Sequence, residues 1–204
     1  MNARDIERRL ARRVSYADAS AEAAGRLVPG AGAAGLLDVA YAETDSPFGR
    51  LLVARTRRGL VRLAYPNEDR EDILTQLASR VSPRLLEAPQ ELDDVRRQLD
   101  AYFAHEREEF DLEIDYALTQ GFFRKVLRAT ARIPYGELST YRGVATRAGS
   151  PRASRAAGNA LGSNPIPIVV PCHRVIHTTG GLGGYTGGLD RKVFLLELEG
   201  AVLD

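Results

Sequence analysis

The only cysteine of the 204-residue chain, Cys172, lies between a proline and a histidine in the stretch PIPIVVPCHRVIHTTGG, residues 165–181. A thiolate is a strong nucleophile, but a free cysteine has a pKa of about 8.5 and stays mostly protonated at neutral pH. His173 could serve as the base that activates this thiol. On an extended strand, neighbouring side chains point to opposite faces, so their cooperation needs a tight turn or a bridging water.

Each of these residues also has an ordinary structural interpretation. Cys172 fits a small buried residue at the end of an IVV strand, which is where many free cysteines lie. His173 and Arg174 fit a polar loop, and the glycines between residues 180 and 188 fit a surface turn. A phosphate-binding loop is excluded there because the GxxxxGK[ST] spacing is missing.

Composition restricts the broad class of protein. The chain is 44% hydrophobic and 27% charged, and it has no apolar run near the ~20 residues that a membrane span requires. The N-terminus lacks the apolar core of a secretory signal. One cysteine can form neither an internal disulfide nor a thiolate metal site by itself. We therefore expect a cytoplasmic protein without metal or cofactor.

Charge is unevenly distributed along the chain. The formal net charge is only +1, but residues 121–192 carry +9 and residues 1–120 carry −5. A basic segment of this kind suits a polyanion such as nucleic acid, although a solvated basic face in an arginine-rich protein would look the same.

The pattern of the first half predicts a small α+β unit. Residues 1–28 are typical of an amphipathic helix, and PGAGAAG at 29–35 of a linker. Three short apolar runs predict antiparallel strands near 37–43, 50–55 and 59–65. Helical spacing follows at 67–81 and 88–106, and residues 110–116 alternate like another strand.

The second half is predicted to be mainly helical. Helices are expected over 119–133, 138–149 and 150–164. In the turn between the last two, Gly149 would close one helix, while Ser150 would cap the next and Pro151 would begin it. Two short helices joined in this way predict a helix-turn-helix, a motif that also arises by chance in helical proteins.

The fold class predicted from these patterns is α+β, an antiparallel sheet unit followed by a helical domain. We place an N-terminal extension at 1–36, an α+β domain at 37–118 and a C-terminal domain at 119–204.

Residues 164–200, NPIPIVVPCHRVIHTTGGLGGYTGGLDRKVFLLELEG, resemble the active-site region of the O6-alkylguanine-DNA alkyltransferases, also called methylated-DNA–protein-cysteine methyltransferases, whose signature is PCHRV. The likeness extends upstream to about Gly121, whereas residues 37–118 are similar only in pattern and residues 1–36 lie outside it.

The resemblance implies direct-reversal DNA repair, in which an alkyl group on O6 of guanine passes irreversibly to the cysteine sulfur. Cys172 would be the nucleophile and His173 would take its proton through a water. Glu199 would orient the histidine, because Glu197, its neighbour in sequence, would face elsewhere on the helix. Asn164 would support the turn that holds the cysteine.

The resemblance also implies contacts with DNA through the minor groove. The target base must leave the stack. Arg155 would fill the space that it leaves, and Tyr141 would contact the rotated phosphate and the flipped base. The small residues Ala153, Ala156 and Gly158 would allow the helix to approach the backbone closely.

The guanine pocket is implied in the same way. The carbonyls of Cys172 and Val175 would accept from the guanine amine, and Tyr185 would stack near the base. Thr186 stands where the family has a small residue near O6, and its methyl group could narrow the pocket. Lys192 matches a contact at the pocket edge.

Two departures from the family pattern bear on activity. Some members of the family bind zinc in the N-terminal half, and that site is excluded here because the chain has one cysteine. Non-catalytic relatives have tryptophan in place of the PCHRV cysteine, whereas this chain keeps Cys172, so it is expected to be active. Residues 179–184 are glycine-rich, and a mobile loop there would admit alkyl groups larger than methyl.

The implied partner is double-stranded DNA containing O6-alkylguanine, with O4-alkylthymine as a second substrate and no membrane. We expect a monomer and leave cooperative assembly on DNA open. The competing functions are a damage sensor that binds without repair, and a cysteine hydrolase.

Overall fold

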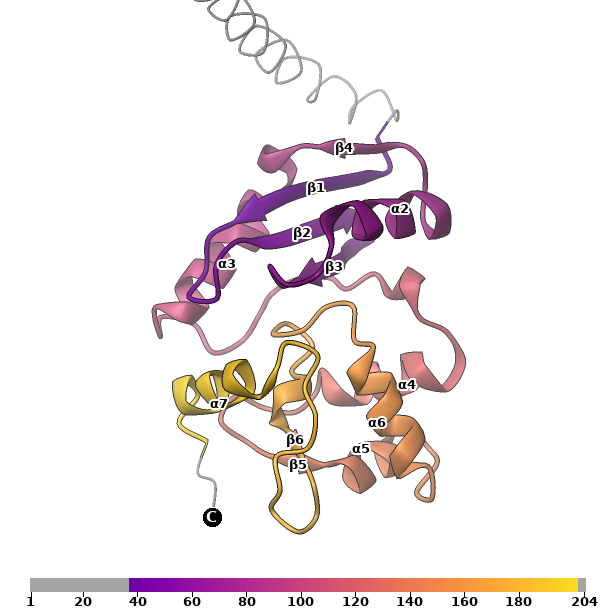
Figure 1. Ribbon diagram of the computed structural model, residues 1–204, viewed down its shortest axis with the longest axis vertical. Coiled ribbons are helices and arrows are strands. Elements are labelled where there is room, and N and C mark those ends of the chain that lie inside the picture. The colour runs from indigo at the N-terminus through magenta and orange to yellow at the C-terminus, as the bar shows by residue number, and fades with distance from the viewer. Residues whose placement is uncertain (1–36, 202–204) are drawn as a thin grey trace, which may run out of the picture. The chain divides into compact units, whose positions relative to one another are not determined.

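The N-terminal half contains a four-stranded sheet with the strand order β3-β2-β1-β4 (Figure 1). The computed structural model describes residues 37–201, so the helix expected at 1–28 and the linker at 29–35 lie outside the described residues. The predicted antiparallel strands are confirmed as β1 (Val39–Thr44), β2 (Leu51–Thr56) and β3 (Gly59–Ala64). The sequence pattern missed β4 (Leu85–Glu87), which pairs with β1 in parallel and is too short to show alternation.

Two helices pack against this sheet. α2 (Arg70–Arg80) places Ile73 and Leu77 in a core cluster with side chains of β1, β2 and β3. A 3-10 turn, η1 (Pro89–Leu92), leads into α3 (Asp93–Phe103), which buries Val95, Leu99 and Tyr102. Every residue of β3 is buried, so both faces of that strand are covered.

The strand predicted over residues 110–116 is wrong. Only Ile114 forms a bridge, to Leu60 of β3. The side chain of Asp115 then accepts a hydrogen bond from the backbone of Ala117 and begins η2 (Tyr116–Leu118). Because the chain turns immediately after Ile114, residues 110–116 cannot pair with β3 as a strand, despite their alternating sequence pattern.

Helices make up most of the C-terminal half (Figure 1). α4, α5 and α6 pack on one another, and two short strands, β5 and β6, pair in parallel below the last helix, α7. The bounds of these elements are α4 Gly121–Thr130, β5 Ser139–Thr140, α5 Tyr141–Arg147, α6 Ser154–Gly162, β6 Val175–Ile176 and α7 Leu189–Leu198.

The turn between α5 and α6 is longer than predicted. Gly149, at φ +84°, closes α5 as expected, and the N–H of Ser150 donates to the carbonyl of Ala145 at 2.9 Å. This bond keeps Ser150 in the C-terminal closure of α5. The predictions that Ser150 caps α6 and that Pro151 begins it are therefore wrong, since α6 begins at Ser154.

The IVV segment before Cys172 is also not a strand. The N–H of Val170 donates to the carbonyl of Ile166 at 2.9 Å, and Ile168 adopts φ +72°. These residues form successive turns instead of extended backbone. Cys172 consequently begins a 3-10 helix, η3 (Cys172–Arg174), in place of ending a strand.

The described part of the chain contains no helix long and apolar enough to cross a membrane. Residues from Val39 onward pack as one compact unit, and the division into domains at 37–118 and 119–204 stays a prediction.

Candidate active site

The side chain of Asn164 holds the turn that carries Cys172. Its Nδ2 donates to the carbonyl of Val170 at 2.8 Å and to Sγ of Cys172 at 3.1 Å, and its Oδ1 accepts from the N–H of Ile166 at 3.0 Å. Asn164 is buried, so these bonds satisfy an amide that has no access to water. Because Asn164 comes two residues after the end of α6, its side chain fixes the sulfur of Cys172 near that end of the helix.

The Cys172 thiol is protonated at neutral pH in this environment. Burial raises its pKa to about 11, although the Asn164 hydrogen bond and the positive charge of Lys192 act in the opposite direction. A thiol in this state reacts only when a base removes its proton. Among residues 37–201, no group of three or more His, Cys, Asp and Glu side chains is placed to hold a metal ion.

His173 is a neutral base with one free nitrogen. Its Nε2 lies 2.9 Å from Oε1 of Glu199, and both side chains are buried. Because a carboxylate only accepts, Nε2 carries the proton and Nδ1 carries the lone pair. Nδ1 is buried and has no hydrogen-bond partner among the described residues. Burial lowers the pKa of His173, against the opposing effect of Glu199.

Glu199 accepts hydrogen bonds from four other residues. Besides His173, Arg174 donates through Nε and an Nη, each at 2.8 Å, and Tyr102 donates its hydroxyl at 2.6 Å. The N–H of Gly136 adds a longer bond at 3.4 Å. Burial by itself would raise the pKa of Glu199, but the hydrogen bonds and charges of His173 and Arg174 lower it to about 2.

Sequence reasoning missed two members of this cluster. Arg174 is buried and paired with Glu199, so its interpretation as an ordinary polar loop residue is wrong. Its position within PCHRV was the available signal. Tyr102 lies in the AYF run of α3, where nothing separates it from an ordinary core aromatic. Glu197 is exposed and Glu199 is buried, so the structure distinguishes between these two carboxylates.

Lys192 of α7 holds the segment after η3 through two hydrogen bonds. It is fully buried and donates from Nζ to the carbonyl of Val175 at 2.6 Å and to that of Leu182. Burial lowers the pKa of Lys192 to about 8. The ammonium therefore ties both β6 and the glycine-rich segment to α7. One lone pair of the Val175 carbonyl is already used by this bond.

A pocket of about 730 Å³ lies between α5, α6 and the glycine-rich segment. Five of the predicted site residues line it: Tyr141, Arg155, Gly158, Tyr185 and Thr186. The other predicted residues do not: Ala153, Ala156, Asn164, Cys172, His173, Val175, Lys192 and Glu199. Six of these are buried, namely Asn164, Cys172, His173, Val175, Lys192 and Glu199, whereas Ala153 and Ala156 are half-buried on and before α6.

Tyr141 forms the floor of this groove. Its ring lies 5.0 Å from that of His177, and its hydroxyl reaches the carbonyl of Gly184 at 3.4 Å. A Cβ on Gly158 would stand 3.7 Å from the Tyr141 ring, an ordinary van der Waals distance, so α6 lies against Tyr141 at this point. His177, which also lines the groove, was not singled out by the sequence.

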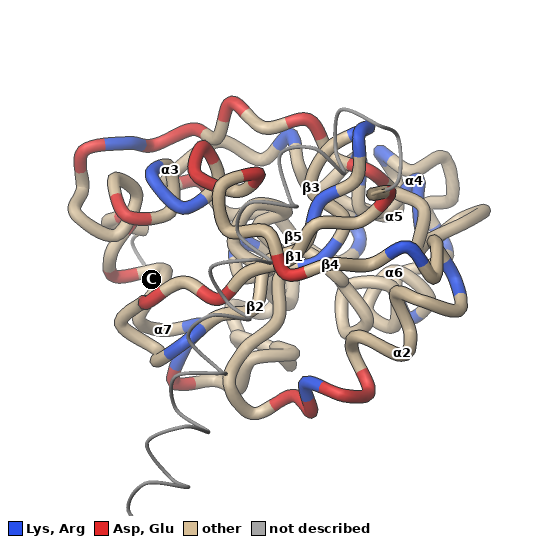
Figure 2. The backbone as a smooth tube through the Cα atoms, turned by 90° about the horizontal axis from the view of Figure 1, so that it is seen from above, with Lys and Arg blue, Asp and Glu red and all other residues tan. Residues whose placement is uncertain are grey.

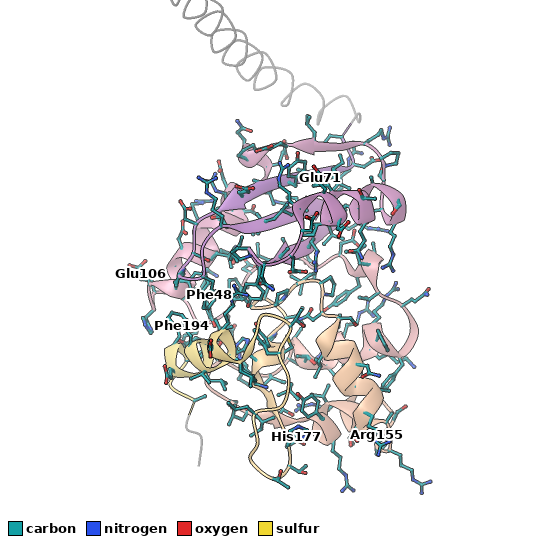
Figure 3. The ribbon with its side chains drawn as sticks, viewed as in Figure 1. Phe48, Glu71, Glu106, Arg155, His177 and Phe194 are labelled. Atoms are coloured by element: carbon teal, nitrogen blue, oxygen red, sulfur yellow. The ribbon has the colours of Figure 1, made fainter. Side chains whose placement is uncertain are left out.

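Thr186 and Arg155 occupy different parts of the groove. The Thr186 hydroxyl donates to the carbonyl of Gly162 at 2.9 Å and so binds the end of α6. Arg155 is exposed on α6 and projects at the same end of the molecule as His177 (Figure 3).

Basic residues predominate around this groove. α4, α5 and α6 contain Arg and Lys but no acidic residue, and Figure 2 shows blue segments along them. The basic residues around the groove therefore suit an anionic ligand.

Comparisons with known proteins agree with this class of site. Residues 121–201 match the family model described as the 6-O-methylguanine DNA methyltransferase DNA-binding domain. Residues 39–116 match the ribonuclease-like domain of the same family. Together the two models cover most of the chain, and the chain therefore belongs to the 6-O-methylguanine DNA methyltransferase family.

Individual relatives extend over the same region. A methylated-DNA–protein-cysteine methyltransferase of Mycolicibacterium paratuberculosis is 44% identical over 79% of this chain and 92% of its own length. The constitutive methylated-DNA–protein-cysteine methyltransferase of Bacillus subtilis is 39% identical over 78% of this chain and 94% of its own length. The structure of Mycobacterium tuberculosis OGT in complex with DNA aligns with a TM-score of 0.67 at 41% identity, covering 78% of this chain and 92% of that one.

The buried carboxylate allows a direct test of stability. Replacing Glu199 with Gln should lower the free energy of unfolding by roughly 3 kcal/mol or more, because the buried charge of Arg174 loses its anionic partner. Glu197→Gln, on the exposed side of the same helix, is the matched control and should change stability by less than about 0.5 kcal/mol. Urea denaturation at neutral pH measures both, and equal effects would contradict this assignment of Glu199.

The same variant tests the pH dependence. The folded-state pKa of Glu199, about 2, lies below the unfolded value of about 4.3. Its contribution is therefore complete above about pH 4.3 and is lost as the pH falls towards 2. The stability difference between the wild-type chain and Glu199→Gln should stay constant down to about pH 4.3 and shrink as the pH falls from there towards 2. A difference that also stays constant below about pH 4.3 would show that Glu199 has no lowered pKa.

Proposed function

We propose that the chain transfers an alkyl group from O6 of guanine in double-stranded DNA to Sγ of Cys172, once per protein molecule. Membership of the family makes the chain a DNA-repair methyltransferase. The observation that carries the residue-level proposal is the buried Nδ1 of His173, which has a lone pair and no hydrogen-bond partner among the described residues. His173 follows the protonated thiol of Cys172 directly in the sequence. O4-alkylthymine is proposed as a second substrate.

The proposed step is a single displacement. The thiol proton passes through a water to Nδ1 of His173, and the Cys172 sulfur then attacks the alkyl carbon. The S–C bond forms as the O6–C bond breaks, and the electron pair of that bond leaves with the guanine, which takes up the proton. Glu199 stabilises the imidazolium that forms in between. The thioether has no acidic proton to lose, so the protein is spent.

Burial of Cys172 suits this mechanism. The thiol is protonated and inert towards general electrophiles while no substrate fills the groove. When the alkyl carbon is held directly against the Cys172 sulfur, proximity raises the rate of transfer and offsets the low nucleophilicity of a protonated thiol. The complete His173–Glu199 pair argues against a sensor, which would not need it. The basic helices α4, α5 and α6 argue against a cysteine hydrolase, which needs no nucleic-acid surface.

The groove supports a proposal for how the target base reaches the thiol. α6 would enter the minor groove and a guanine would rotate out of the duplex into the pocket beside Tyr141 and Tyr185. Arg155, exposed on α6, would fill the space left in the stack. Ala153 and Ala156 would face the sugar-phosphate backbone at close range. The proposed location is the cytoplasm and the proposed active form is a monomer.

Intact-protein mass spectrometry tests the reaction itself. After incubation with a duplex containing O6-methylguanine, the chain should gain one methyl group, located on the peptide that contains Cys172. Cys172→Ser should gain none while keeping its affinity for the duplex. Tight binding without any mass change in the wild-type chain would favour the sensor and overturn the transfer.

The role of Arg155 is tested by comparing two substrates. Arg155→Ala should slow transfer from O6-methylguanine in duplex DNA by roughly tenfold or more, because extrusion of the base costs a few kcal/mol. Transfer from the free base, which needs no extrusion, should change by less than about twofold. Arg152→Ala, an exposed arginine that does not line the groove, controls for the lost charge. Equal slowing on both substrates would remove the stacking role.

A further inference from the structure

Tyr65, the residue that follows β3, joins the N-terminal half to the wall of the pocket. It is 2% exposed, and its hydroxyl lies 2.7 Å from that of Tyr185, 120 positions further along the chain. The two rings meet edge to face, with centroids 6.2 Å apart. Burial raises the pKa of both hydroxyls, so each is neutral and one donates to the other.

The surroundings leave little room for either ring to move. A Cβ on Gly187 would lie 2.6 Å from the Tyr65 ring and 2.9 Å from the Tyr185 ring, closer than real contacts allow. The guanidinium of Arg191 stacks over the Tyr65 ring at 4.7 Å and also donates to the carbonyl of Gly187 at 2.8 Å and to Asn67 at 2.5 Å. The segment after Tyr185 is thus attached to the turn after β3.

Tyr185 in turn faces the chemical centre. It lines the 730 Å³ pocket, and its ring stands nearly perpendicular to that of His173, with centroids 6.3 Å apart. If Tyr185 were free, its ring could swing away and enlarge the space in front of the thiol. Its hydroxyl is held instead by a buried group that belongs to the other half of the chain.

We propose that Tyr65 is a positioning residue that limits the size of the O6 substituent the site accepts, by holding Tyr185 close to His173. This inference rests on the proposed alkyl transfer and adds its substrate range. Small alkyl groups such as methyl fit in front of the fixed ring. A bulky aryl-methyl group requires that ring to withdraw, and withdrawal breaks the hydrogen bond between the two tyrosines.

The test is the ratio of transfer rates from O6-benzylguanine and O6-methylguanine, supplied as free bases. Tyr65→Phe keeps the ring and removes only the hydroxyl, and it should raise the benzyl-to-methyl ratio by roughly three- to tenfold. Tyr41→Phe in β1 is the matched control and should leave the ratio unchanged, because its hydroxyl interacts with Arg70 and Glu87 and Tyr41 does not line the pocket.

A double-mutant cycle separates positioning from a general loss of stability. Tyr185→Phe breaks the same bond from the other side and should raise the ratio similarly. The double variant should then show little further change, because the shared bond is already absent. A ratio unchanged in Tyr65→Phe, or effects that simply multiply in the double variant, would overturn the inference. A wild-type chain that accepts neither alkyl group on Cys172 would instead contradict the proposed function and this inference with it.

Discussion

The carboxylate of Glu199 is the interaction on which the rest of the site depends. A buried charge of this kind is tolerated only when hydrogen bonds and an opposite charge replace the water that it loses. Arg174 supplies the charge, and the side chains of His173 and Tyr102 supply further bonds. This arrangement decides which nitrogen of His173 carries a proton. The other nitrogen, Nδ1, is therefore left available to the thiol proton. No single residue of the cluster could produce this arrangement alone.

The same constraint explains why the N-terminal half is part of the chemistry. Tyr102 on α3 reaches Glu199, and Tyr65 after β3 reaches Tyr185, so two hydroxyls from the sheet half contact the two sides of the acceptor site. The helical half presents the groove and the sulfur. An aromatic contact also joins the two halves, since the rings of Phe48 and Phe194 pack edge to face with centroids 5.0 Å apart (Figure 3). The site is consequently assembled by the whole described unit.

The sequence predicted the residue types of the chemical centre better than their geometry. The three short antiparallel strands follow from local apolar runs and are confirmed. Turn residues predict the two short helices α5 and α6, but the turn between them is longer than predicted. The sequence predicts a strand before Cys172 because β-branched residues favour extended backbone. The Asn164 side chain instead bends this segment through hydrogen bonds to Val170 and Ile166, a side-chain effect that apolar patterning does not show. Tyr102 and Tyr65 could not be identified from sequence, because each acts through a partner about a hundred positions away. Burial of Arg174 is likewise a tertiary effect.

The most direct test of the account is the protonation state of His173 in the intact, unreacted protein. Nitrogen-15 NMR distinguishes the two neutral tautomers and the imidazolium, with His105 and His177 as internal references. The account predicts a neutral ring protonated on Nε2 between about pH 6 and pH 8, because burial disfavours the charged form and Glu199 fixes the proton. A ring protonated on Nδ1, or an imidazolium throughout this range, would leave no lone pair for the Cys172 proton and would contradict it.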